Sequence, residues 1–334
     1  MQHSILFVVH AGEGIGLGHL TRSLVAARSL VLRLGAHIDF VAVGQTIDDR
    51  LIQDFKVHFV VRDGPIDVVI DRLRKNNHYA AICLDLYEPA LLLNLGIVLE
   101  SARKTGCKIV AIDSLCGFED HIDLLYVPSF VPAPKPKGVK FRGRLAYGWD
   151  AYLLNIQAKA KEERQDPSGS ILALTGGSDV MQLGRDWPAI LNQHLPSGSL
   201  VDWVTGPFSK RPIFPESSNV KFVEHDAPTG LTSLMQGALA AVTVYGVSFF
   251  ELIALGVPTV VFSPYGGRYS SELRGISEHR IALVAQDATD AADQVARLMK
   301  DSHLRAELSC NARDKMKNFD GEYFAAELKL LLTT

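Results

Sequence analysis

Residues 16–22 read Gly16-Leu17-Gly18-His19-Leu20-Thr21-Arg22, and they join an apolar run to an amphipathic one. Residues 5–9 are continuously apolar, which is typical of a buried strand. After the glycines, apolar residues recur at helical spacing: Leu20, Leu24, Ala27 and Leu30. The pattern predicts a strand, a glycine turn and a helix with His19 in its first turn. Because that turn has unpaired N–H groups and the positive end of the helix dipole, we expect it to attract phosphate or an oxyanion.

The glycine loop at residues 12–18 differs from two common phosphate-binding loops. Its glycines alternate, so they lack the spacing of a dinucleotide-binding fingerprint, and no Lys-Ser or Lys-Thr pair ends the loop as in a P-loop. Two interpretations remain open. Either the loop and His19 carry chemistry, or the glycines only permit a turn and His19 only caps the helix.

The bulk composition is that of an ordinary globular protein with two domains. The chain has 334 residues, of which 47% are hydrophobic and 21% charged, and its net charge of −3 gives no support to a nucleic-acid partner. The four cysteines are scattered without a Cys-x-x-Cys pair, which indicates reduced thiols and a cytoplasmic protein. The first four residues lead straight into a predicted strand, so we expect no signal peptide; no charge-free apolar run reaches about 18 residues, so we expect no transmembrane segment.

Apolar, β-rich runs alternate with helical patterns along the chain. They lie at residues 5–10, 38–43, 57–61, 80–84 and 108–112, and again at 171–175, 200–205, 220–223, 240–245 and 259–263. This alternation indicates parallel sheets covered by helices on both faces. Between the two series, proline and basic residues in 128–144 predict a linker or long loop. Residues 288–332 predict three helical segments, divided near Asp301 and Asp320.

The predicted fold class is therefore α/β, with two Rossmann-like parallel-sheet domains facing a cleft and C-terminal helices packing back across both. We expect an N-terminal domain over residues 1–149, a C-terminal domain over 150–320, and a last helix over 321–334 that can return to the N-terminal domain. Ligands of such sheets bind beyond the carboxyl ends of the strands. In the first half, the residues at those ends include Asp85 and Asp113 as well as the glycine loop.

Two turns in the second half could hold a phosphorylated ligand. The turn Thr175-Gly176-Gly177-Ser178-Asp179 follows the first strand there. Residues 243–251 predict a strand, a turn with Gly246 and a helix start with Ser248 and Glu251. Ser248 and Glu251 have the spacing of a capping box, which needs no function. Alternatively, Gly246 lets a diphosphate approach the helix N–H groups, and Glu251 accepts hydrogen bonds from ribose.

Together these pieces resemble the GT-B superfamily, in particular the branch with the MurG-type glycosyltransferases and the PseG-type UDP-sugar hydrolases. The resemblance covers nearly the whole chain. Its matching pieces, in order, are residues 16–22, Leu84-Asp85-Leu86-Tyr87, Ala111-Ile112-Asp113-Ser114, Thr175-Gly176-Gly177-Ser178-Asp179, and Tyr245-Gly246-Val247-Ser248-Phe249-Phe250-Glu251 with Leu255-Gly256-Val257-Pro258.

The resemblance assigns roles to these residues. It implies that His19 acts as a general base or lies next to the reacting sugar carbon. It also implies that the second half holds the nucleotide, with Glu251 on the ribose. In the resemblance, Gly176, Gly177, Gly246, Val247 and Ser248 line the diphosphate. Together with Glu251, and with residues chosen from their own positions in the sequence, the predicted ligand-binding set comprises Gly16, Gly18, Gly176, Gly177, Ser178, Gly246, Val247, Ser248, Glu251 and Arg268. GT-B enzymes generally need no metal, and no cluster here has metal-ligand spacing, so we expect neither a metal nor another cofactor.

Several roles stay open at this point. Asp85 or Asp113 could orient His19 or bind acceptor hydroxyls, or each could only cap the next helix. Arg22 and Arg268 could offset the charge of a diphosphate or lie on the surface.

The leading hypothesis is a glycosyltransferase that moves a sugar from a nucleotide-diphosphate sugar, UDP-linked, to a small-molecule acceptor, with His19 as general base. Two alternatives remain. One is a PseG-like nucleotide-sugar hydrolase with water as acceptor, and the other is a catalytically silent nucleotide-sugar-binding subunit.

Overall fold

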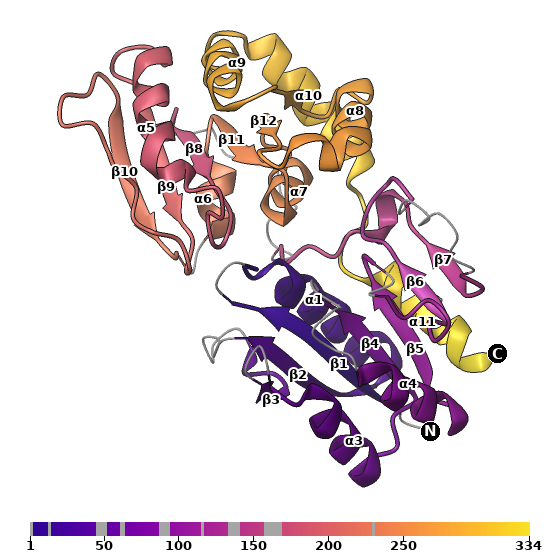
Figure 1. Ribbon diagram of the computed structural model, residues 1–334. Helices are drawn as coiled ribbons and strands as arrows, with labels where there is room; N and C mark the ends of the chain where they lie inside the picture. Colours follow the sequence, from indigo (N-terminus) through magenta and orange to yellow (C-terminus); the bar gives the residue numbers. More distant parts are fainter. Residues whose placement is uncertain are drawn as a thin grey trace. The chain divides into compact units, whose positions relative to one another are not determined.

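The computed structural model forms two compact units, and each is described by itself (Figure 1). The first unit comprises Met1–Asn155 and Asn318–Thr334, and the second comprises Ile156–Lys317. The first unit thus extends past residue 149, because Ala151 and Leu153 are buried in its core. The structure describes residues 3–12, 15–44, 52–60, 64–86, 94–114, 117–132, 141–156, 169–228 and 231–334, without the side chain of Arg268.

The first unit contains a parallel sheet of seven strands in the order β3-β2-β1-β4-β5-β6-β7. The strand order reverses between β1 and β4, as in a doubly wound α/β fold. The strands are β1 (Ser4–Ala11), β2 (His37–Gly44), β3 (Lys56–Val60), β4 (Ala81–Asp85), β5 (Lys108–Ile112), β6 (Leu124–Tyr126) and β7 (Arg144–Ala146). The helices are α1 (Gly18–Leu34), α3 (Ile66–Asn76), α4 (Leu95–Lys104) and α11 (Glu322–Thr333), with a 3-10 turn at Trp149–Ala151.

Both faces of this sheet are buried, which explains why its strands are continuously apolar. Alternate residues of β1 point to opposite faces: Phe7 packs in the core beneath α1 and α11, and Val8 packs in the core beneath α3 and α4. A strand with only one buried face would show polar residues at every second position instead.

Helix α11 returns from the end of the chain to pack on α1 (Figure 1). Its Phe324 is fully buried and lies edge-on to Tyr126, with ring centroids 4.9 Å apart. Its Glu327 is also buried, and it accepts a 2.9 Å hydrogen bond from Arg144 of β7. Gly321 precedes the helix with φ of 82°, and a Cβ there would lie 2.9 Å from Ser29 of α1. The close approach to α1 therefore requires glycine at this position.

The second unit repeats the plan with six parallel strands in the order β10-β9-β8-β11-β12-β13. Helices α5 and α9 share one buried core with the sheet, and the other core includes residues of α6 and α7. The strands are β8 (Ile171–Leu174), β9 (Leu200–Thr205), β10 (Lys221–Asp226), β11 (Ala240–Val244), β12 (Thr259–Phe262) and β13 (Leu283–Val284). The helices are α5 (Leu183–His194), α6 (Leu231–Gly237), α7 (Val247–Ala254), α8 (Ser270–Glu278), α9 (Ala288–Lys300) and α10 (Ser302–Lys315), with a 3-10 turn at Gly266–Tyr269.

The three predicted C-terminal helical segments are present as α9, α10 and α11. Asp301 separates the first two because its carboxylate accepts a 2.9 Å hydrogen bond from the N–H of Leu304 in the first turn of α10. Asp320 marks the second division, where it forms an isolated bridge with Leu153 before α11 begins.

The linker predicted over residues 128–144 ends where an unpredicted strand begins. Arg144 is the first residue of β7, which pairs in parallel with β6 at the edge of the sheet. The signal was weak because β7 has only three residues and two of them, Arg144 and Leu145, are not buried. Residues 133–140 of the same segment lie outside the described part of the chain.

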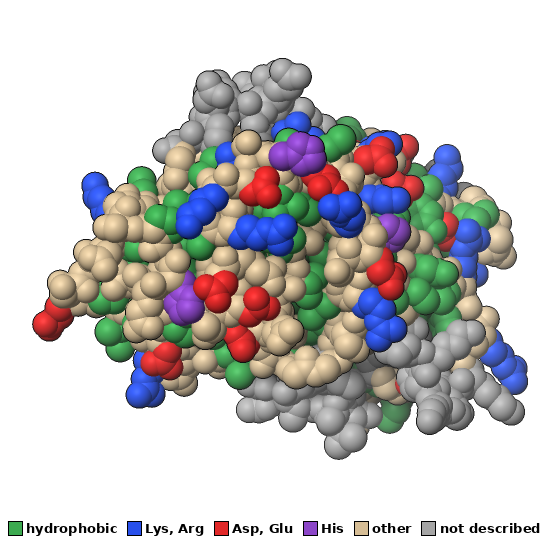
Figure 2. Space-filling model, turned by 90° about the horizontal axis from the view of Figure 1, so that it is seen from above, with side chains coloured by type: hydrophobic (Ala, Val, Ile, Leu, Met, Phe, Trp, Pro, Cys, Tyr) green, Lys and Arg blue, Asp and Glu red, His purple; other side chains and the backbone are tan. Residues whose placement is uncertain are grey.

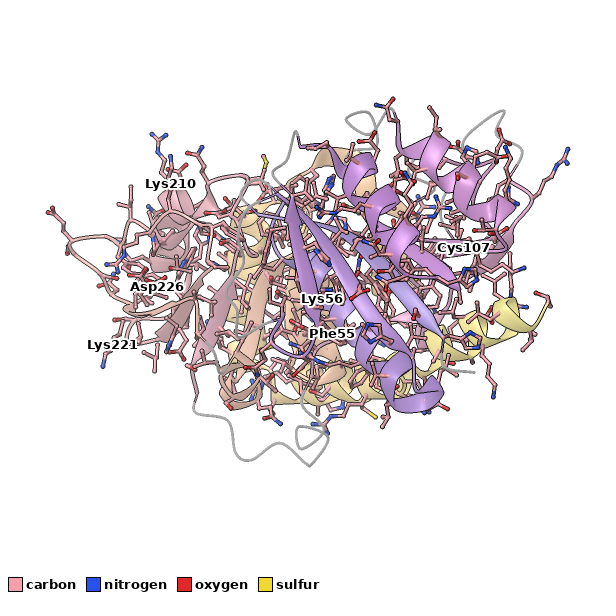
Figure 3. All side chains as sticks on the ribbon, turned by 90° about the horizontal axis from the view of Figure 1, so that it is seen from below. Phe55, Lys56, Cys107, Lys210, Lys221 and Asp226 are labelled. Carbon is pink, nitrogen blue, oxygen red and sulfur yellow. The ribbon has the colours of Figure 1, made fainter. Side chains whose placement is uncertain are left out.

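Charged side chains of both signs are interspersed on the face drawn in Figure 2. Figure 3 shows Lys221 and Asp226 at β10, an edge strand of its sheet, and Phe55 and Lys56 where β3 begins.

Cys83, Cys107 and Cys310 carry free thiols, and Cys116 lies outside the described residues. Among the helices that the structure describes, none has the length and apolar character of a membrane-crossing segment.

If the return of α11 stabilises the first unit, Phe324→Ala should destabilise that unit alone. Loss of this buried ring should cost about 3–5 kcal/mol. Hydrogen exchange of the full chain should then quicken in peptides from β1 and β4 and stay unchanged in peptides from β8 and β11. Leu330→Ala is the control, since Leu330 lies on the same helix and is 43% exposed. Equal effects of the two variants would contradict this account of α11.

Candidate active site

The glycine loop and Asp85 meet where the strand order of the first unit reverses. Strand β1 leads into the loop and α1, and its neighbour β4 ends at Asp85. The register pairs Val9 of β1 with Asp85, which places this carboxylate beside the start of α1. Such a switch point is where open α/β sheets bind their ligands.

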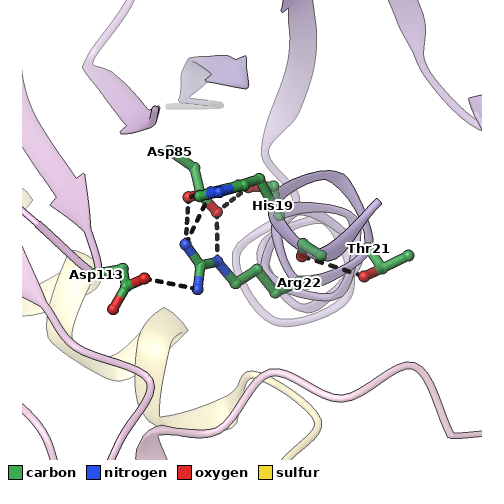
Figure 4. Close-up of polar contacts among 7 residues, drawn as sticks. His19, Thr21, Arg22, Asp85 and Asp113 are labelled. Carbon is green, nitrogen blue, oxygen red and sulfur yellow. Dashed lines mark hydrogen bonds and ion pairs between the residues drawn. The ribbon is translucent and has the colours of Figure 1, made fainter. Parts of the chain in front are cut away.

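Asp85 is the centre of a polar cluster that Figure 4 draws. Its carboxylate is fully buried and lies 2.6 Å from Nδ1 of His19. Arg22 donates to both of its oxygens, from Nε at 2.7 Å and from Nη2 at 2.6 Å. Ser23 adds a fourth donor at 3.1 Å. These four donors belong to three residues in the first turns of α1, so among the described residues one helix supplies the partners of this carboxylate.

These contacts determine which nitrogen of His19 carries the proton. A carboxylate can only accept a hydrogen bond from the ring, so Nδ1 at 2.6 Å from Asp85 must hold a proton. Nη2 of Arg22 is also 3.0 Å from Nδ1, but both groups are donors and both point to the same Asp85 oxygen. The lone pair of the neutral imidazole is therefore on Nε2, which is the atom that can take a proton.

Arg22 supplies the charge that keeps Asp85 ionised. Burial alone would raise the pKa of the Asp85 carboxyl, but the positive charge of Arg22 and the contact with His19 outweigh it and hold that pKa well below its usual range. Burial would lower the pKa of the Arg22 guanidinium, yet Asp85 and Asp113 raise it above its usual value. The sequence interpretation of Arg22 as a surface residue is wrong, because its side chain is only 10% exposed.

Asp113 belongs to the cluster through Arg22 and not through His19. It follows β5, and its Oδ2 accepts a 3.1 Å hydrogen bond from Nη1 of Arg22. Its backbone has φ of 75°, in the left-handed region that residues other than glycine rarely adopt. Its N–H donates to the carbonyl of Tyr126 at 2.8 Å, which helps to hold this conformation. Strained residues of this kind gather at functional sites.

The glycine loop before α1 closes on itself. Gly16 donates its N–H to the carbonyl of Gly12 at 2.7 Å, and Gly12 donates back at 3.2 Å. Both glycines have positive φ, 137° at Gly12 and 83° at Gly16. Gly18 is the first residue of α1, and the cap before it, Leu17, makes no side-chain hydrogen bond. The interpretation of His19 as a simple helix cap is therefore wrong, since its ring bonds to Asp85.

In the second unit, both predicted glycine turns follow neighbouring strands at the switch point of that sheet. Strand β8 runs into Gly176 and Gly177, and β11, which pairs with β8, runs into Gly246. Gly176 has φ of 91°. A Cβ at Gly206, after β9, would lie 2.3 Å from the Gly176 carbonyl, so three turns come together at the carboxyl edge of this sheet.

The residues around these turns differ in what they contribute. Ser178 is partly buried in the first turn, and Asp179 after it accepts hydrogen bonds from the N–H groups of Leu183 and Gly184, so it stabilises the start of α5. Burial raises the pKa of the Asp179 carboxyl despite these two bonds.

The capping-box interpretation of Ser248 and Glu251 is wrong. Helix α7 begins at Val247 with Gly246 as its N-cap, and no side chain caps it. Ser248 is already inside the helix, and Glu251 lies one turn further on. The cap is thus a residue without a side chain, which leaves backbone N–H groups as the polar feature of this helix end.

Two of the predicted residues lie partly or wholly outside the described part of the structure. Arg268 lies in the 3-10 turn Gly266–Tyr269, and its side chain lies outside the described part of the structure. Tyr87 lies outside it entirely. Among the residues that are described, no three His, Cys, Asp or Glu side chains are grouped as metal ligands.

Sequence reasoning missed the part that Arg22 and Ser23 play. A signal was available for Arg22, since residues three apart on a helix share a face and Arg22 follows His19 by three. Arg22 therefore lies on the same helix face as His19, where it can pair with the aspartates that follow two strands, Asp85 and Asp113.

The low pKa of Asp85 leads to a testable pH dependence. A carboxyl with a lowered folded-state pKa contributes stability in full above its unfolded value, ordinarily 3.8, and loses it as the pH falls through the folded value. Asp85→Asn should therefore lower the free energy of unfolding by about 3–5 kcal/mol at neutral pH and flatten its fall below about pH 4. Urea unfolding between about pH 3 and pH 7 measures both.

The control for this experiment is Asp54→Asn. Asp54 pairs with Arg28 at 3.1 Å but is 50% exposed, so its loss should cost no more than about 1 kcal/mol. Parallel pH curves for wild type and Asp85→Asn would show that Asp85 does not carry the charge assigned to it.

Several solved proteins share the fold of this chain. No protein-family model and no curated protein sequence matches the chain. Solved structures do match it over its whole length. MurG of Acinetobacter baumannii is 13% identical, with a TM-score of 0.66, over 99% of this chain and 100% of that one.

Two plant proteins match equally well. Phytolacca americana UGT2, complexed with UDP-2fluoro-glucose and pterostilbene, is 14% identical with a TM-score of 0.68, over 99% of this chain and 100% of that one. Medicago truncatula UGT71G1, complexed with UDP-glucose, is 12% identical with a TM-score of 0.66, over 100% of this chain and 99% of that one. These matches confirm the predicted fold class: the chain has the GT-B fold of MurG-like glycosyltransferases, with two Rossmann-like parallel-sheet domains.

Proposed function

We propose that this protein is a glycosyltransferase that moves a sugar from a nucleotide-diphosphate sugar to a small acceptor, with His19 as general base. The observation that carries the proposal is the 2.6 Å contact between His19 Nδ1 and the buried Asp85 carboxylate. It leaves the lone pair on Nε2 and fixes the orientation of the ring, as a general base requires. An imidazole that only filled space would need no buried carboxylate with a lowered pKa.

The proton and the electrons balance in this reaction. Nε2 of His19 takes the proton of an acceptor hydroxyl while the oxygen of that hydroxyl forms a bond to the anomeric carbon of the sugar. The bond between that carbon and the diphosphate breaks, and its electron pair leaves on the nucleoside diphosphate. Asp85 stays ionised and stabilises the imidazolium that forms, as the carboxylate of a catalytic triad does.

The second unit is assigned the nucleotide. The diphosphate would lie against the turns at Gly176, Gly177 and Gly246, with Val247 and Ser248 contributing N–H groups at the start of α7. Glu251 would accept hydrogen bonds from the ribose, and Ser178 and Arg268 would complete the set. Gly16 and Gly18 would shape the loop that precedes His19 in the first unit. In this proposal helix N–H groups stabilise the leaving diphosphate, and no metal is needed.

The solved neighbours support a UDP-sugar as donor. One of them is complexed with UDP-2fluoro-glucose and pterostilbene, another with UDP-glucose, and a third, Arabidopsis thaliana UGT89C1, with quercetin. Because the identities are 12–14%, these ligands suggest which donors to test first and do not name the sugar.

The proposal is tested by incubating the full chain with UDP-, GDP-, dTDP- and CMP-sugars, with and without a mixture of methyl glycosides. Nucleotide release and the fate of the sugar are followed by mass spectrometry. His19→Ala should lower turnover by about 100-fold to 10,000-fold, because it removes the base. His78→Ala is the control, since His78 is an exposed histidine of the same unit.

Each outcome has a distinct meaning. Release that requires a methyl glycoside supports a transferase, and release of free sugar without one supports the hydrolase alternative. Tight binding of one nucleotide sugar with no turnover under either condition would support a silent binding subunit and contradict the proposal.

Gly246→Ala tests the site proposed for the diphosphate. A Cβ at Gly246 meets no atom within 4 Å, and its φ is not in the left-handed region, so the variant should fold normally. If the diphosphate contacts this turn, the added methyl group should weaken UDP binding about tenfold, as measured by calorimetry. Gly237→Ala is the matched control, because a Cβ there also meets open space. Unchanged affinity in Gly246→Ala would place the diphosphate elsewhere.

A further inference from the structure

Asp113 differs from Asp85 in a way that the roles assigned so far do not explain. Asp85 is fully buried against His19, Arg22 and Ser23, whereas the Asp113 side chain is 51% exposed. Among the described residues, Asp113 accepts a side-chain hydrogen bond through Oδ2, from Nη1 of Arg22 at 3.1 Å. Asp113 is thus tied to the base through one guanidinium, and its carboxylate still reaches the solvent.

The simplest structural role for Asp113, a helix cap, does not fit. No helix lies between Asp113 and β6 in the residues described there, 113–114 and 117–123. A glycine or asparagine would also adopt the left-handed backbone, so the conformation alone does not call for a carboxylate. The ion pair with Arg22 accounts for one oxygen of the carboxylate, Oδ2, and the half-exposed side chain leaves room for a second contact.

We infer that Asp113 contacts the acceptor, by accepting a hydrogen bond from a hydroxyl next to the one that His19 deprotonates, and that Arg22 is the positioning residue that fixes Asp113 relative to His19. The inference rests on the proposed function. It names the acceptor class: a molecule with neighbouring hydroxyl groups, such as a sugar, rather than a simple alcohol.

The charge of the cluster supports this class of acceptor. Two carboxylates, Asp85 and Asp113, share the single guanidinium of Arg22, and the imidazole of a general base is neutral. The cluster therefore keeps an excess negative charge, which disfavours a phosphate group next to the reacting hydroxyl, contrary to the phosphate attraction expected at the start of α1. Hydroxyl groups, by contrast, donate readily to a carboxylate, and hydrogen bonds to charged acceptors are the stronger ones.

Arg22 is suited to positioning because its donors are divided between the two carboxylates. Nε and Nη2 bind Asp85, and Nη1 binds Asp113. A lysine would keep the charge but has no planar fork that can hold both partners at once. A shift of Arg22 would therefore move the acceptor contact and the support of His19 together.

The experiment compares Asp113→Asn with wild type, using the active nucleotide sugar and a methyl glycoside that accepts the sugar. Asparagine tolerates the left-handed backbone, so the fold should be retained. We expect the acceptor KM to rise about tenfold or more, because a charged hydrogen bond is lost, while kcat and the donor KM change less than about threefold. Monodeoxy analogues of the glycoside identify the partner: one of them should raise the wild-type KM and have no further effect in Asp113→Asn.

Two further variants separate positioning from folding. Asp54→Asn is the matched control, because Asp54 is 50% exposed and also pairs with an arginine at 3.1 Å. It should change neither constant. Arg22→Lys should lower kcat and raise the acceptor KM, and adding Asp113→Asn to it should raise KM little further. If Arg22→Lys does not fold, Asp113→Asn with the deoxy analogues still decides the acceptor contact.

If the wild type transfers sugar and Asp113→Asn leaves the acceptor KM unchanged, this inference is overturned and the proposed function stays intact. The inference is also overturned if every deoxy analogue raises the acceptor KM by the same factor in Asp113→Asn as in the wild type. Absence of turnover with every nucleotide sugar would overturn both, since the inference rests on the proposed function.

Discussion

The buried charge of Asp85 is the constraint on which the site of the first unit depends. A fully buried carboxylate is unfavourable unless several donors and a positive charge compensate it. Among the described residues, one helix, α1, supplies these groups: His19, Arg22 and Ser23. The compensation fixes the direction in which α1 leaves the glycine loop, and it fixes the tautomer of His19. Structure and proposed chemistry therefore share a single electrostatic cause.

The two units carry different kinds of residues at the point where the strand order of each sheet reverses. Each places its turns at the point where a parallel sheet reverses its strand order. In the first unit that point carries ionisable side chains packed against each other. In the second it carries glycines, with Gly206 so close to Gly176 that no side chain would fit. The first arrangement suits proton transfer, and the second leaves backbone N–H groups open to a phosphorylated ligand.

The sequence predicted features whose pattern lies within one strand or helix, and it missed features that depend on short edge strands or on residues far apart in the chain. The continuous apolar runs of β1, β4, β8 and β11 predicted both parallel sheets, because a strand buried on two faces has no other pattern. Strand β7 was missed because its three residues at a sheet edge have no such pattern. The start of α7 was misread because a cap by Gly246 leaves no side-chain signal, whereas Ser248 and Glu251 imitate one. The partners of Asp85 lie more than 60 residues away, so their contact depends on strand order, which the sequence shows only indirectly.

The central claim is that Asp85 holds His19 with its proton on Nδ1 and its lone pair on Nε2. Nitrogen-15 NMR of the full chain, with His19 assigned by comparison with His19→Ala, tests it directly. The account predicts that in the neutral form of the ring Nδ1 is protonated and Nε2 is not, and that Asp85→Asn abolishes this preference. A ring protonated on Nε2, or a preference that Asp85→Asn leaves unchanged, would contradict the account.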